Sequence, residues 1–112
     1  MMTDNQFNSN YMDFVNRIGT IADITYGHLC KLSRYNEIRQ DRYDAIADAV
    51  IDITDMAYND GSDYFMLHSI EHAEHMFNTY KQTTNYHDAE YYKYYARCMK
   101  KYHDIYLMCM TY

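Results

Sequence analysis

The sequence contains no proline and only three glycines among its 112 residues. These two residues interrupt helices most often, and average usage of about 5% proline and about 7% glycine would supply several of each. No segment alternates polar and apolar residues in the way that predicts a strand. The scarcity of helix breakers therefore favours long helices, and the chain length suits one domain with a single hydrophobic core.

Cysteine is also scarce, since the chain has only Cys30, Cys98 and Cys109 and no CxxC pair. An odd number of cysteines without metal-ligand spacing is typical of reduced thiols in a cytosolic protein. The polar N-terminus, MMTDNQFNSN, lacks the basic and apolar regions of a signal peptide, and no apolar run has the length of a membrane span. We therefore expect a cytoplasmic protein.

Positive charge is outweighed by negative charge. Ten lysines and arginines stand against sixteen aspartates and glutamates, for a formal net charge of −6. Residues 41–63 hold seven aspartates and one arginine, so this segment alone accounts for the imbalance. Because an acidic protein repels nucleic acid and anionic membranes and attracts basic surfaces, we expect neither nucleic acid nor membrane as a direct partner.

Apolar residues recur at spacings of three and four along four segments, which predicts amphipathic helices. The first helix is expected to end near Leu32 and to follow a flexible arm at residues 1–9. The other helices are expected at residues 41–59, at 63–81, and from 86 almost to the C-terminus. The predicted caps are Ser9 or Asn10, Gly61, Ser62, and Thr84 or Asn85. Together these features predict an all-α protein, a compact antiparallel four-helix bundle forming a single domain over residues 1–112.

The second predicted helix carries an unusual row of acidic side chains. Their spacings are three, four, four and three, which places them in a nearly straight line: Asp41, Asp44, Asp48, Asp52 and Asp55. Aspartate is a mediocre helix former, and like charges at these spacings repel by roughly 0.2–0.5 kcal/mol per pair. The first two aspartates favour the helix dipole, but Asp52 and Asp55 lie too far along the helix to benefit from it.

Such a row predicts a binding surface, with all five aspartates as its contact residues. Successive carboxylates stand about 5–6 Å apart on a helix, a spacing comparable with that of backbone phosphates. A rigid row of them imitates one strand of nucleic acid for a basic groove on a partner protein. We therefore predict a small acidic, non-enzymatic binding protein whose partner has a basic surface, such as a nucleic-acid enzyme. In general character it is similar to the acidic, tyrosine-rich inhibitors made by viruses and mobile elements.

The same row has two alternative interpretations. One is a plain solvated helix face. The second is neutralisation by cations of the last helix, within one chain or between copies: Lys93, Arg97, Lys100 and Lys101. Pairing between copies, together with fifteen tyrosines, predicts a self-associating helical scaffold or a bundle that holds a small ligand between subunits.

The third predicted helix carries a row of histidines in the segment HSIEHAEH: His68, Glu71, His72 and His75. Histidines four residues apart are a workable metal pair, so a metal-dependent enzyme is a further alternative. The segment lacks the HExxH order, however, and its predicted direction is outward, opposite the apolar face. Two His-Asp pairs lie sixteen residues apart on the last helix, too far for one metal. No nucleophile or phosphate-loop motif occurs, so we predict no catalytic residue and no cofactor.

Overall fold

The computed structural model describes most of the chain, in four segments: residues 3–34, 38–60, 63–83 and 85–110. Within these segments the chain is an all-α helical bundle without strands, which confirms the predicted fold class. The helices and a single π-helical turn, η1, follow in the order α1 (Asp4–Arg34), α2 (Gln40–Asp55), η1 (Met56–Asp60), α3 (Asp63–Tyr80) and α4 (Tyr86–Cys109). None of the described helices has the length and apolar character needed to cross a membrane.

The start of the first helix differs from the prediction. Residues 4–9, expected to form a flexible arm, belong to α1, and the predicted cap at Ser9 or Asn10 is wrong. The cause is a capping box at the true start. The backbone N–H of Gln6 donates to the Thr3 hydroxyl oxygen at 3.1 Å, while the Gln6 side-chain oxygen accepts from the Thr3 N–H at 3.5 Å.

The remaining helix boundaries agree closely with the predicted ones. Asn85 caps α4, because its side-chain oxygen accepts from the Asp88 N–H at 3.2 Å and its side-chain amide donates to the Asp88 carboxylate at 2.6 Å. The predicted caps at Gly61, Ser62 and Thr84 lie outside the described residues. The π-helical turn η1 continues α2 to Asp60 and was not predicted.

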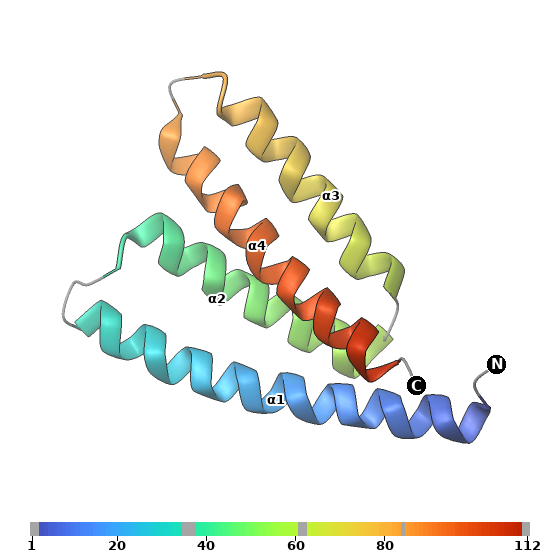
Figure 1. The fold of residues 1–112 in the computed structure, drawn as a ribbon. Helices are drawn as coiled ribbons and strands as arrows, with labels where there is room; N and C mark the ends of the chain where they lie inside the picture. The colour runs from blue at the N-terminus through green and yellow to red at the C-terminus, as the bar shows by residue number, and fades with distance from the viewer. Residues whose placement is uncertain (1–2, 35–37, 61–62, 84, 111–112) are drawn as a thin grey trace.

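The other three helices all pack on α4 (Figure 1). Consecutive helices run in opposite directions, and α4 lies between α2 and α3 in the view of Figure 1. Helix α3 packs mainly on α4, whereas α1 packs on both α2 and α4. Helices α2 and α4 run in the same direction and pack closely, while α2 and α3 contact each other little. The bundle is accordingly flat and long, with extents of 50 × 32 × 21 Å.

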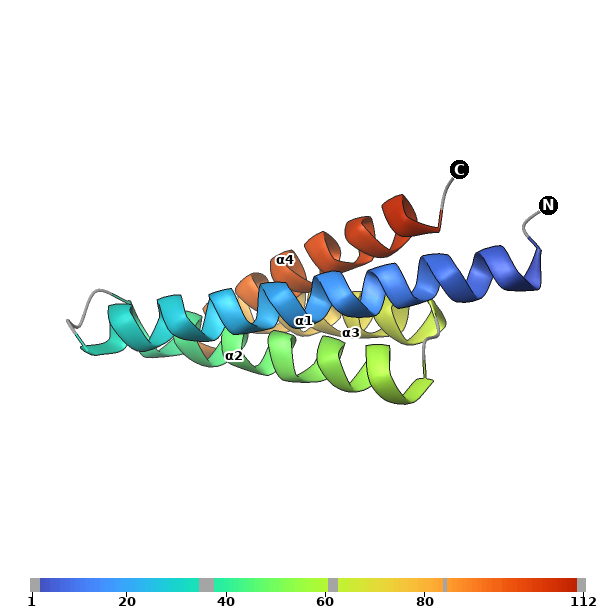
Figure 2. The ribbon, with the colours of Figure 1, turned by 90° about the horizontal axis from the view of Figure 1, so that it is seen from below.

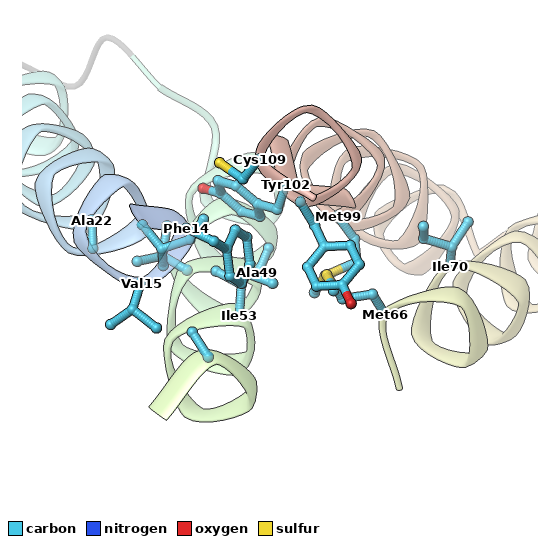
Figure 3. Close-up of a cluster of buried hydrophobic side chains, with 14 residues drawn as sticks. Phe14, Val15, Ala22, Ala49, Ile53, Met66, Ile70, Met99, Tyr102 and Cys109 are labelled. Carbon is cyan, nitrogen blue, oxygen red and sulfur yellow. The ribbon is translucent and has the colours of Figure 1, made fainter. Parts of the chain in front are cut away.

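The hydrophobic core follows the contacts of α4 (Figure 3). Its largest fully buried side chains come from all four helices: Phe14, Ile18, Val50, Ile53, Met66 and Met99. Ala45 and Ala49 of α2 are also completely buried. Because alanine side chains are small, positions of this kind allow neighbouring helices to lie close together.

Candidate functional site

The buried face of α2 lies beside the acidic row rather than opposite it. Ala45 and Ala49 are fully buried, while Tyr43 and Ala47 are only half-buried. The buried face is therefore rotated toward the aspartates. As a result, the row runs along the edge of the contact between α2 and α4.

The first aspartate is removed from the surface altogether. Asp41 is only 2% exposed. Its carboxylate accepts hydrogen bonds from the Arg39 guanidinium and from the Arg42 N–H, both at 2.7 Å, and lies 3.9 Å from Nδ1 of His87. Asp41 thus joins the start of α2 to the start of α4. The prediction that it contacts a partner is wrong, because a partner cannot reach a buried carboxylate.

The middle of the row is held by tyrosines of α4. The Tyr91 hydroxyl donates to Asp48 Oδ2, and the Tyr95 hydroxyl donates to Asp52 Oδ2, each at 2.5 Å. Both pairs are 43 residues apart in sequence. Helices α2 and α4 run in the same direction (Figure 1). Two aspartates four residues apart on α2 therefore lie beside two tyrosines four residues apart on α4, and each pair forms one hydrogen bond.

The surroundings of these tyrosines keep their phenols protonated. Burial raises the pKa of Tyr95 well above its ordinary value, and the hydrogen bond to Asp52 raises it further. The pKa of Tyr91 is raised by the same two causes, burial first and then the bond to Asp48. A protonated phenol donates to the carboxylate, and a hydrogen bond to a charged acceptor is stronger than one to a neutral acceptor. In each carboxylate the bond is made by Oδ2.

The two outer aspartates complete the row. Asp44 is half-buried and accepts a hydrogen bond at 2.7 Å from the side-chain amide of Gln40, while Asp55 is exposed. Among the described residues, no lysine or arginine forms an ion pair with Asp44, Asp48, Asp52 or Asp55. Four carboxylates therefore lie along the surface of α2 with their charge not offset by ion pairs with described cations of the same chain.

Cations of α4 have other neighbours. Lys93 pairs with Glu90 at 3.3 Å, and Lys100 pairs with Glu74 of α3 at 2.7 Å. The guanidinium of Arg97 lies over the ring of Tyr94, 5.8 Å from its centroid. For the described residues, the idea that α4 cations neutralise the row within one chain is therefore wrong. The α4 side chains that bond to the row are instead the tyrosines Tyr91 and Tyr95, whose hydroxyls donate hydrogen bonds.

A groove lies between α2 and α3, with α4 as its floor. Its volume is about 380 Å³. The lining combines one carboxylate, two imidazoles, three phenols and two small side chains: Asp52, His68, Ser69, His72, Ala73, Tyr91, Tyr92 and Tyr95. The groove exists because α2 and α3 both pack on α4 rather than on each other.

The four residues of the histidine row are exposed, as the sequence predicted. Two of them, His68 and His72, also line the open groove. Glu71 and His75 are exposed and do not line it. Within the described segments, no three His, Cys, Asp or Glu side chains come together in a group able to hold a metal ion.

Comparison with known proteins adds no relative. No family model, curated protein or solved structure matches this chain. Any functional inference therefore rests on the residues and their geometry alone.

The hydrogen bonds that Tyr91 and Tyr95 donate to the row were not predicted from the sequence. A signal for them does exist. Asp48 and Asp52 are matched 43 positions later by Tyr91 and Tyr95, so the same four-residue spacing of polar side chains occurs on both helices. Recognising it requires knowing that α2 and α4 are parallel neighbours, which only the tertiary structure shows.

Proposed function

We propose that this chain is a small acidic binding protein without enzymatic activity. In this proposal, helix α2 occupies a basic nucleic-acid-binding groove on a partner protein and excludes nucleic acid from it. The contact residues are the four surface carboxylates: Asp44, Asp48, Asp52 and Asp55. Inhibition of the partner follows from this competition, in the manner of the small acidic inhibitors that viruses and mobile elements produce.

The observation that carries the proposal is the fixed orientation of two carboxylates in the middle of the row. The Tyr91–Asp48 and Tyr95–Asp52 hydrogen bonds hold two carboxylates in one orientation before any partner arrives. Association is opposed by the side-chain freedom that must be lost at an interface, so carboxylates that are already ordered reduce that cost. Lys93 and Lys100 of α4 form ion pairs with glutamates, and Arg97 lies over a tyrosine ring.

The charge density of the row is also suitable. Asp44 and Asp55 are separated by eleven residues, or about 16 Å at a rise of about 1.5 Å per residue. Four charges over this length give one charge per roughly 5 Å of the α2 axis. One strand of B-DNA carries one charge per about 3.4 Å of the DNA helix axis. A basic groove would therefore meet a similar but somewhat sparser row of negative charge.

The test uses a triple variant, Asp44→Asn, Asp48→Asn and Asp55→Asn. Host proteins retained by the immobilised wild-type chain are compared with those retained by this row variant. The protein that the wild-type chain retains and the row variant does not is then purified. We expect that protein to bind the wild-type chain with an affinity that falls steeply with salt, and to release a labelled duplex oligonucleotide as the chain is added. The row variant should lose most of this binding.

A matched control removes three charges elsewhere, through Asp4→Asn, Glu71→Gln and Asp104→Asn, which are exposed residues of α1, α3 and α4. This control should bind nearly as well as the wild type. The proposal fails if no host protein distinguishes the wild type from the row variant. It also fails if the captured protein still binds the oligonucleotide at full affinity in the complex.

Self-association is a second candidate, favoured by a different observation. Among the described residues, eight of the eleven large exposed hydrophobic side chains belong to the end of the bundle where α1 begins and α4 ends (Figures 1 and 2): Phe7, Met12, Tyr58, Tyr64, Phe65, Leu67, Leu107 and Met108. Apolar side chains gathered at one end are typical of a protein–protein contact.

If this end joins two copies, sedimentation velocity should show a larger species as the protein concentration rises. The double variant Leu67→Asp and Met108→Asp should remain monomeric, because a charge buried in the contact is unfavourable. Ile24→Asp, at a side chain 67% exposed in the middle of α1, should behave as the wild type does. A wild-type chain that stays monomeric at every concentration would exclude this candidate.

A further inference from the structure

The groove between α2 and α3 combines negative charge with aromatic surface. Asp52 lies on one wall, Tyr91 and Tyr95 form the floor, and the imidazoles of His68 and His72 lie on the α3 side. Of the residues that line it, Asp52 is the one carboxylate, and neither lysine nor arginine is among them. The charge of the groove therefore selects against anions and in favour of a cation.

The aromatic rings form a corner. The rings of Tyr91 and Tyr92 are nearly perpendicular, at 87° with centroids 5.0 Å apart, so the two rings offer differently directed surfaces to a bound group. Tyr80 stacks on Tyr92 at 5.9 Å and 2°, and Tyr95 lies nearly parallel to Tyr91 at 6.2 Å. These neighbours fix the ring orientations before a ligand enters. The faces of such rings attract cations, the more strongly when water is excluded.

The carboxylate of Asp52 adds a directional acceptor. Its Oδ2 accepts from Tyr95, which fixes the plane of the carboxylate and leaves Oδ1 for a further donor. A guanidinium group is planar, stacks on aromatic rings and donates in a fixed fork to carboxylate oxygens. A lysine ammonium is a compact, strongly hydrated charge that neither stacks nor forks, so the combination of ring and carboxylate suits arginine better.

We propose that the groove lined by Asp52, Tyr91, Tyr92 and Tyr95 binds the guanidinium group of an arginine side chain that the partner protein inserts. This inference deepens the proposed function, on which it rests for the source of the arginine. It adds a pocket for one side chain beside the row of carboxylates, and so a preference among basic partners. A groove of about 380 Å³ holds one such side chain, not a folded segment.

The site is tested on the full chain by NMR titration with ethylguanidinium and, separately, with ethylammonium. We expect saturable shift changes at the groove residues, with ethylguanidinium binding several-fold more tightly than ethylammonium. Asp52→Asn keeps an oxygen for the Tyr95 hydroxyl but loses the charge, and it should weaken ethylguanidinium binding at least fivefold. Tyr92→Leu should weaken it as well, whereas Asp104→Asn on the exposed side of α4 should not.

The outcomes separate this site from the proposed function. Absence of saturable shifts, or equal binding by the wild type and Asp52→Asn, would overturn the guanidinium site even if partner capture depends on the row. Conversely, the row variant Asp44→Asn, Asp48→Asn and Asp55→Asn should still bind ethylguanidinium, because none of these three residues lines the groove. If that variant binds ethylguanidinium and captures the partner as the wild type does, the guanidinium site is supported and the proposed function is contradicted.

Discussion

Replacing Met99 with alanine is expected to lower the free energy of unfolding by about 2–5 kcal/mol, the usual cost of truncating a large buried side chain. Met99 is completely buried on α4, the helix that contacts the other three. Its removal leaves a space in the hydrophobic cluster that joins all four helices and also includes Met66 and Tyr102. Because small domains are stable by only about 5–15 kcal/mol, this change is a large part of the total.

Urea unfolding followed by circular dichroism measures the effect. Met108→Ala provides a matched control on the same helix, since the Met108 side chain is 61% exposed. Its effect should lie within about 0.5 kcal/mol of the wild type. If Met99→Ala and Met108→Ala prove equally mild, α4 is not the centre of the core.

Replacing Tyr95 with phenylalanine is expected to lower the free energy of unfolding by about 1.5–3 kcal/mol at neutral pH, the usual value of a hydrogen bond to a charged group. The ring remains, so packing changes little. What is lost is the donor to Asp52, which leaves a half-buried carboxylate without that bond. Tyr58→Phe is the control, because the Tyr58 side chain is 61% exposed and its effect should be within about 0.5 kcal/mol.

This difference should shrink as the solution becomes alkaline. The pKa of Tyr95 in the folded protein is raised by burial and by Asp52, whereas in the unfolded chain it is near the ordinary value of about 10. Above that value the unfolded chain loses the phenol proton first, so the stabilisation is complete below it and is lost as the pH rises. Urea unfolding of the wild type and Tyr95→Phe at about pH 8 and about pH 11 should therefore give a smaller difference at the higher pH. An unchanged difference would show that the phenol proton is not held by the folded state.

Helix type and extent were largely predictable from residue pattern. The scarcity of glycine and proline and the regular apolar spacing predicted four helices, and α4 is capped by Asn85, one of the two residues predicted for that position. The error at the first helix came from the polar sequence around Asp4, which hid the capping box of Thr3 and Gln6. A cap depends on two side chains bonding back to the backbone, and polarity alone does not reveal it.

The candidate site was predictable only in part. That the aspartates form one row follows from their spacing, because a helix places residues three and four apart on the same side. Whether each carboxylate is exposed to solvent, hydrogen-bonded to another helix or buried does not follow from spacing. Asp41 is buried against Arg39, Asp48 and Asp52 bond to tyrosines, and Asp55 is exposed, although all five occupy equivalent positions in the pattern.

Residue spacing was enough to predict that this chain is helical, acidic along one helix and amphipathic, since these properties depend on neighbours within a few residues. Which side of α2 meets α4 became known from the packing of the helices, which buries Ala45 and Ala49 and brings Asp48 to Tyr91, 43 residues away. Helix α3 packs on α4 and contacts α2 little, and this arrangement leaves the groove beside Asp52 between α2 and α3. Contacts between distant helices depend on how side-chain volumes fit together, and no periodicity within a single helix encodes that fit.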